Sequence, residues 1–181
     1  MTERDREVLR LQIGRPMRAT SVVLRRCSLG LPIVVKVPPI LDTGVPFPTL
    51  YWLTCPLAHR RIARIEGQGG VRAAQDKVVA DPELWAKLQA RHIGYAAERE
   101  ALLPLEAPHR PSGGVGGTSG SVKCLHAHYA DFTAGNDNPI GRDVHALVGD
   151  PCCEVPCVSV VDGAPQLNPN WREPSDDDER R

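Results

Sequence analysis

The densest group of potential ligands or nucleophiles in the sequence is the pentapeptide Cys124-Leu125-His126-Ala127-His128. Thiolate and imidazole groups are the ligands that zinc, iron and copper sites use. If this segment is helical, Cys124 and His128 are four residues apart and point the same way, whereas His126 points nearly opposite. A Cys124 nucleophile with a histidine base is chemically possible. The helical spacing places these groups along one face rather than head to head, which favours metal binding.

A metal site built on one helix needs further ligands, which the other cysteines could supply. Cys55 follows a predicted strand, Cys27 lies in a predicted hairpin turn, and Cys152, Cys153 and Cys157 lie close together near the carboxyl end. These spacings match no standard pattern such as C-x2-C paired with C-x2-C. Buried free cysteines often act as small apolar residues, and helix-face histidines as core residues. Inert thiols and a redox pair therefore stay open beside a bound metal or cluster.

A second candidate site is the stretch rich in Gly and Pro at 104–120, which precedes a predicted helix over 121–132. Backbone N–H groups at the amino end of a helix favour anions. The candidate anion-binding residues are therefore Gly117, Gly120, Ser121 and Lys123. The stretch has neither the spacing of a Walker loop nor the context of a dinucleotide fingerprint. A flexible linker explains the same composition.

Hydrophobic patterns predict the sheet that would position the cysteines. The β-branched runs at 21–24 and 31–37 flank a turn in which Gly30 supplies conformational freedom, and 49–54 reads as a third strand. We expect a small antiparallel sheet from about 20–55.

The rest of the domain is predicted to be mostly helical. Asp81-Pro82 is a favourable helix start, since a capping carboxylate precedes proline at the first helical position. Four or five helices are expected to pack the sheet in a single α+β domain over 1–167, with the loop at 104–120 as its longest connection. The acidic stretch 168–181 is predicted to be a disordered tail.

Composition bounds the possible partners and the compartment. The 22 basic and 22 acidic residues balance, so no general attraction to nucleic acid or anionic membranes is expected. The charged amino terminus does not resemble a signal peptide, and no apolar run reaches the roughly 20 residues of a membrane span. We therefore predict a cytoplasmic protein without a membrane partner. In that reducing compartment metal or redox chemistry is a more common use of cysteine than a stable disulfide.

Five motifs are distinctive in combination: RCSLGLP at 26–32, PFPTLYWLTCP at 46–56, VKCLHAH at 122–128, GNDNPIG at 135–141 and the pair Pro156-Cys157. Together they resemble an uncharacterised bacterial family, domain of unknown function 501, over roughly residues 10–160. The resemblance implies membership without an activity. It also implies that the family motifs include Cys27, Cys55, Cys124 and Cys157, whereas Cys152 and Cys153 are less typical. A four-thiolate set, with His128 and then His126 as substitutes, becomes the sharper candidate.

The preferred function is a cytosolic protein of unknown activity that binds zinc or an iron–sulfur cluster; the sequence does not choose between them. One alternative is a metal-dependent enzyme acting on a phosphorylated or nucleotide substrate. The other is an interaction module with inert thiols. Its link to cell division or phosphate metabolism is implied by the resemblance, because family genes lie near those for a septum-formation initiator and an exopolyphosphatase. No particular partner is indicated.

Overall fold

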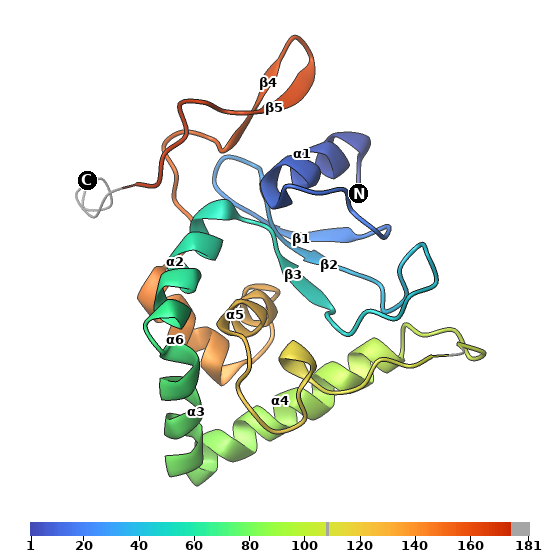
Figure 1. The fold of residues 1–181 in the computed structure, drawn as a ribbon, viewed down its shortest axis with the longest axis vertical. Helices are drawn as coiled ribbons and strands as arrows, with labels where there is room; N and C mark the ends of the chain where they lie inside the picture. Colours follow the sequence, from blue (N-terminus) through green and yellow to red (C-terminus); the bar gives the residue numbers. More distant parts are fainter. Residues whose placement is uncertain (108, 175–181) are drawn as a thin grey trace.

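Two small antiparallel sheets and six α-helices make up the part of the chain that the structure, a computed structural model, describes: residues 1–107 and 109–174 (Figure 1). The predicted α+β class is confirmed, with more helices than the four or five expected. The elements are α1 (Glu3–Ile13), β1 (Val22–Arg26), β2 (Pro32–Lys36), β3 (Tyr51–Leu53), α2 (Pro56–Gly67), α3 (Gly70–Ala80), α4 (Pro82–Glu100), the 3-10 turn η1 (Val115–Gly117), α5 (Leu125–Thr133), α6 (Pro139–Val148), β4 (Val158–Val161) and β5 (Ala164–Leu167).

The three-stranded sheet has β2 in the middle, paired antiparallel with β1 and β3. Val34 contributes to the main core, which the sheet shares with α2, α4, α5 and α6, whereas Val35 packs in a smaller core with Leu9 of α1. Figure 1 accordingly shows α1 and α5 on opposite sides of the sheet. Because both faces are covered, β2 reads in the sequence as an uninterrupted apolar run.

An ion pair fixes α1 to the edge of this sheet. Arg26 at the end of β1 donates to both carboxylate oxygens of Asp5, at 2.8 and 2.9 Å. Asp5 also accepts from the Thr2 amide in a capping box at the start of α1. The bond from Arg26, more than any other interaction, lowers the pKa of Asp5 to about 2.

Acid is therefore expected to weaken the attachment of α1. A carboxylate whose folded pKa is depressed stabilises the fold fully above its unfolded pKa and loses that contribution as the pH falls toward its folded value. Between about pH 4 and about pH 2 this loss should be on the order of 1–2 kcal/mol in the wild type, and Asp5→Asn should lack it. Urea unfolding across this range measures the difference. The exposed Asp76→Asn is the control, and a wild-type slope in Asp5→Asn would contradict the prediction.

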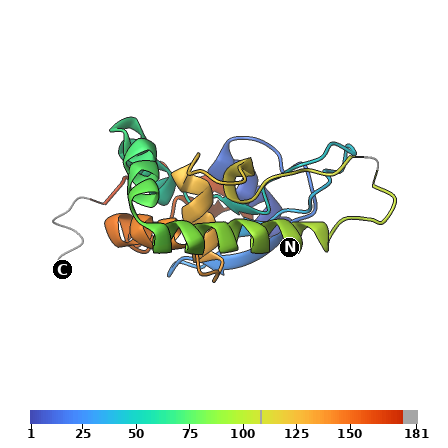
Figure 2. The same ribbon diagram turned by 90° about the horizontal axis from the view of Figure 1, so that it is seen from below.

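The helical layer contacts the sheet mainly through α5, which packs against β3, and α4 adds a hydrogen bond to it. Asp81 caps α4 as predicted, its side chain accepting from the amides of Glu83 and Leu84 at 2.9 and 3.1 Å. Near the far end of the helix, the Tyr95 hydroxyl accepts from the Leu50 amide at 2.5 Å, which connects α4 to the start of β3. Figure 2 shows α4 at full length, with α3 at one end and the loop after residue 100 at the other.

The structure corrects the prediction of a helix that begins at residue 121. The helix α5 begins at Leu125, and Cys124 before it has extended backbone angles of φ −149° and ψ 116°. Part of the preceding loop is packed rather than free: Val115 in η1 is fully buried, and its amide donates to His92 at 3.0 Å. The apolar Val115 anchors this segment against α4, which composition alone did not indicate.

The carboxyl-terminal segment forms a hairpin beside α1 (Figure 1). Its two strands, β4 and β5, pair antiparallel. Beyond the hairpin, the Arg60 guanidinium lies 4.7 Å from the ring centre of Trp171, and Glu173 pairs with Arg64. These contacts place the first part of the predicted tail against α2. Residues 175–181 lie outside the described residues.

Candidate metal centre

The helix α2 presents polar side chains to the start of α5. His59 and Glu66 are seven residues apart on α2, two turns of the helix, and therefore lie on the same side. Opposite them, Cys124 precedes α5 and His126 lies in its first turn. Residues far apart in the sequence thus meet at one junction between two helices.

Three of these side chains form a compact group of potential metal ligands. One ligand atom each from Glu66, Cys124 and His126 lies within 4.8 Å of the other two, and all three residues are half-buried. The His126 Nδ1 atom is 3.2 Å from Glu66 Oε1 and 3.9 Å from Cys124 Sγ. Carboxylate, thiolate and imidazole are all ligands that zinc accepts.

The backbone fixes which nitrogen of His126 faces the group. His126 Nε2 lies 3.1 Å from the carbonyl oxygen of His59, so this nitrogen carries a proton and donates it. The Nδ1 lone pair is then directed at Glu66 and Cys124. Histidines that bind metals typically donate a hydrogen bond from the ring nitrogen that does not face the metal, because this bond sets their tautomer and orientation.

In the absence of a metal, a proton can hold the group together. Burial lowers the pKa of His126, but the Cys124 thiol, the His59 carbonyl and the Glu66 carboxylate together raise it above its ordinary value. Glu66 has a structural role as well, since its Oε1 accepts from the Leu125 amide at 2.6 Å and so caps α5. A bound cation would replace the proton without disturbing this cap, because a carboxylate oxygen has more than one lone pair.

A pocket opens beside the group. It has a volume of about 330 Å³ and is lined by Cys124, His126, His59 and part of β3, among other residues. The rings of His59 and His126 are 4.3 Å apart between centres. Burial, and then the neighbouring His126, lower the pKa of His59, so His59 is mainly neutral near pH 7. The pocket therefore gives a small molecule access to both imidazoles.

The predicted ligand set is divided between this group and other parts of the fold. Cys124 and His126 meet here, although the prediction placed Cys124 and His128 on one helix face; Cys124 lies outside the helix, so that geometry is wrong. Cys55 is buried at the amino end of α2, and Cys27 and Cys157 are half-buried in the β1–β2 turn and before β4. Among the described residues, no other group of three ligands meets the same distance limit.

His128 lies in the main core instead. The Asn138 side chain lies against His128 Nδ1, with its Nδ2 and Oδ1 at 3.0 and 3.2 Å; its Nδ2 also donates to Asp131 at 2.8 Å, and its Oδ1 accepts from the Gly141 amide. The buried Nε2 atom of His128 has no hydrogen-bond partner among the described residues, and His128 belongs to no group of three potential ligands there. Burial lowers the pKa of His128 to about 4, so the neutral form prevails near pH 7.

The residues predicted to bind an anion are arranged around a turn rather than a helix end. Thr118 Oγ1 donates to the Ser121 carbonyl at 2.7 Å, and the first amide of α5, that of Leu125, donates to Glu66. In the described part of the chain, Gly116 is the only glycine that lines the 330 Å³ pocket, and it lies beside Lys123 and Cys124. Anion binding by Gly117, Gly120, Ser121 and Lys123 stays a prediction.

Sequence reasoning did not single out Glu66 or His59. Both lie in a helix whose charged side is dominated by Arg60, Arg61 and Arg64, so an acidic residue and a histidine there read as part of a solvated face. The available signal was their seven-residue spacing on a helix that follows directly from Cys55. Only the packing of α2 against α5 gives that spacing a partner.

Comparison with known proteins identifies a family. A family model described as "Protein of unknown function (DUF501)" matches residues 23–146, which is more than half of the chain and includes Glu66, Cys124 and His126. No curated protein and no solved structure matches. Among the described residues, no helix combines the length and apolar character that crossing a membrane requires.

Proposed function

The chain belongs to the DUF501 family of proteins of unknown function, and we propose that it binds a zinc ion. The ligands are Glu66, Cys124 and His126. The observation that carries this proposal is the convergence of the three ligand atoms within 4.8 Å, with Nδ1 of His126 turned toward the other two. Metal binding is also the function that the cysteines and histidines of the sequence favour.

The separations fit a single ion. Tetrahedral zinc with bonds of about 2.0–2.1 Å to nitrogen and oxygen and about 2.3 Å to sulfur sets its ligands roughly 3.3 Å (N to O) and roughly 3.6 Å (N to S) apart. The corresponding distances here are 3.2 Å and 3.9 Å. Both agree to within a few tenths of an ångström, and the ligand atoms of Glu66 and Cys124 lie within 4.8 Å of each other.

Three protein ligands leave one position of a tetrahedral ion open, which is the arrangement of catalytic rather than structural zinc. The 330 Å³ pocket adjoins that position. Zinc held in this way lowers the pKa of a bound water and polarises carbonyl or phosphoryl oxygens. Neutral His59, exposed in the same pocket, is placed to accept a proton. A hydrolytic enzyme is therefore the activity that this site would suit.

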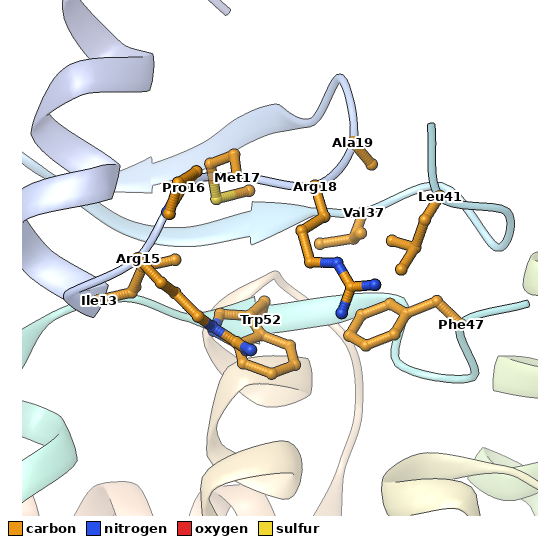
Figure 3. A pocket seen from close by; sticks show the side chains of 10 residues that line it. All are labelled: Ile13, Arg15, Pro16, Met17, Arg18, Ala19, Val37, Leu41, Phe47 and Trp52. Atoms are coloured by element: carbon orange, nitrogen blue, oxygen red, sulfur yellow. The ribbon is translucent and has the colours of Figure 1, made fainter. Parts of the chain in front are cut away.

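The surface beside this pocket favours an anionic substrate. A second pocket of about 420 Å³ shares Trp52, Leu53 and His59 with it and adds Arg15 and Arg60. Figure 3 shows Arg15 beside Trp52, and its guanidinium carbon is 5.3 Å from the ring centre. Among the described residues, neither lining includes an acidic side chain. This supports the alternative of a metal-dependent enzyme acting on a phosphorylated or nucleotide substrate in the cytoplasm.

Replacing Cys124 or His126 with alanine is expected to weaken zinc binding by at least about 100-fold, since loss of an outer-shell partner alone costs about 10–100-fold. Glu66→Gln should weaken it as well while keeping an oxygen for the Leu125 amide. Competition titration with a coloured zinc chelator measures these affinities. The matched controls Cys152→Ala and His109→Ala remove exposed residues outside the group and should bind as the wild type does.

Two results would overturn the proposal. One is wild-type protein that takes up less than one zinc per chain at saturation. The other is a Cys124→Ala or His126→Ala protein that is folded by circular dichroism and binds zinc with unchanged affinity. Hydrolysis of p-nitrophenyl phosphate by zinc-loaded protein tests the proposed activity separately, so that a binding site without catalysis can be recognised.

A further inference from the structure

The remaining thiols gather at a different place, the end of the sheet next to α1. Three segments meet there: the β1–β2 turn with Cys27, the junction of β3 and α2 with Cys55, and the segment before β4 with Cys153 and Cys157 (Figure 1). None of these residues belongs to the Glu66–Cys124–His126 group. A site formed by these thiols would therefore be separate from the proposed zinc site.

Hydrogen bonds connect the three segments around one backbone carbonyl. Gln12 of α1 donates to the Pro32 carbonyl at 3.1 Å and approaches Cys157 Sγ at 3.6 Å. The Thr54 hydroxyl donates to the same carbonyl at 3.2 Å, and Cys55 is the next residue. On the other side of Pro32, the Leu31 carbonyl accepts from the Cys27 amide at 2.9 Å. Cys27, Cys55 and Cys157 thus lie around the carbonyl groups of Leu31 and Pro32, where β2 begins.

Packing adds Cys153 to the set. Cys27 and Cys153 pack against the main core, to which buried Cys55 belongs. Cys27, Cys153 and Cys157 are half-buried, whereas the neighbouring Cys152 is exposed. Burial selects four of the five thiols in this region.

The four thiols also affect one another electrostatically. Burial, with smaller contributions from the thiols of Cys157 and Cys153, raises the pKa of Cys55 to about 12. Burial raises the pKa of Cys157 in the same way, with contributions from Cys153 and Cys27. Amides at the start of α2 donate to Cys55 and oppose the rise. Thiolates gathered at one place need a cationic centre to balance their charge, which is what a metal cluster provides.

We propose that Cys27, Cys55, Cys153 and Cys157 ligate an iron–sulfur cluster. A single zinc ion with bonds of about 2.3 Å would hold its thiolates about 3.8 Å apart. Among the described residues, however, no three of these sulfurs lie within 4.8 Å of one another. A four-iron cluster binds each thiolate to a different iron, so its ligands are farther apart. The set keeps three of the cysteines favoured by the sequence and replaces Cys124 with Cys153.

The test is to purify the full chain without oxygen, reconstitute it with ferrous iron and sulfide, and measure iron, acid-labile sulfide and visible absorption. The wild type is expected to hold about four irons and about four sulfides per chain, with a broad visible band. Cys27→Ser, Cys55→Ser, Cys153→Ser and Cys157→Ser should each lose most of the iron and the band. Cys152→Ser and Cys124→Ser should keep both, the latter because it affects only the zinc site.

The critical comparison is between Cys152→Ser and Cys153→Ser, because the two residues are adjacent in the chain and only the half-buried Cys153 is proposed as a ligand. Equal losses in Cys152→Ser and Cys153→Ser would overturn the assignment, as would a wild type that binds zinc in place of iron at this set or forms a disulfide and stays colourless. Because buried Cys55→Ser could fail to fold, zinc binding at Cys124 and His126 serves as an internal check of each variant. A serine variant of one of the four proposed ligands that still binds zinc at Cys124 and His126 but lacks iron supports the cluster. Such a variant that keeps both the zinc and the iron contradicts it.

Discussion

Gly141→Ala is expected to unfold the domain or to lower its free energy of unfolding by more than about 4 kcal/mol. Gly141 lies in the first turn of α6, where that helix packs against α5. A Cβ atom built at this position would lie 2.1 Å from the His128 carbonyl oxygen and 2.5 Å from the Phe132 Cβ. Backbone cannot give way to such a contact as a flexible side chain can, so the two helices would have to separate.

The matched control for this prediction is Gly67→Ala. Gly67 ends α2 with no atom within 4 Å of an added Cβ, and its φ is in the ordinary range. Alanine there should leave stability unchanged or raise it by up to about 1 kcal/mol. Urea denaturation of both variants makes the comparison. A Gly141→Ala protein with the stability of Gly67→Ala would show that α5 and α6 can move apart at little cost.

The same helix contact bears on the candidate metal centre. His126 lies two residues before His128 in α5, so a separation of α5 from α6 would shift the first turn of α5 relative to α2. Should Gly141→Ala fold at all, we expect its zinc affinity to fall together with its stability. The position of Cys124 and His126 thus depends on a glycine in α6, a helix that contributes no ligand to the candidate metal centre.

Local patterns predicted most of the fold because local energetics determine it. The Asp81 cap, the hairpin around Gly30 and the strand at Tyr51–Leu53 each depend on residues within a few positions of one another. The start of α5 was not predictable in this way. Its first amide is satisfied by Glu66, 59 positions earlier in the chain, rather than by the nearby Ser121.

The candidate site was predictable only in part for the same reason. Residue type identified Cys124 and His126, since few side chains other than thiol and imidazole bind transition metals. Their partner Glu66 is an ordinary carboxylate on a helix, and only tertiary packing distinguishes it from a solvated one. Cys153 was set aside because the family resemblance marks Cys152 and Cys153 as less typical of the motifs, whereas the burial of Cys153 beside Cys27 becomes visible only in the fold.

The second large effect is expected from the buried ion pair between α4 and α5. Arg91 donates to both carboxylate oxygens of Asp131, at 2.8 and 2.9 Å, and the Asp131 side chain is fully buried. Asn136 and Asn138 donate to the same carboxylate, at 3.1 and 2.8 Å. Arg91 has a further partner in Glu98, whereas Asp131 has no other cationic partner among the described residues. Loss of Arg91 should therefore be the more damaging change.

Arg91→Met, which keeps most of the apolar stem, is expected to lower the free energy of unfolding by about 3–5 kcal/mol, because it leaves a buried carboxylate without its counter-ion. Adding Asp131→Asn should recover part of this loss, since it removes the uncompensated charge and keeps one oxygen to accept from either Asn136 or Asn138. Arg72→Met is the control: its pair with Asp76 is exposed, so the change should cost less than about 1 kcal/mol.

Acidity gives this prediction a second readout. Burial already raises the pKa of Asp131 beside Arg91, and removing the guanidinium should raise it further. A carboxyl group with a folded pKa above its unfolded value takes up a proton on folding, so stability increases as the pH falls through that range. The loss caused by Arg91→Met should consequently be largest near pH 7 and shrink toward about pH 5, as measured by urea unfolding at each pH. A loss that stays constant with pH, or one that Asp131→Asn does not reduce, would show that Arg91 stabilises the fold by packing rather than by neutralising Asp131.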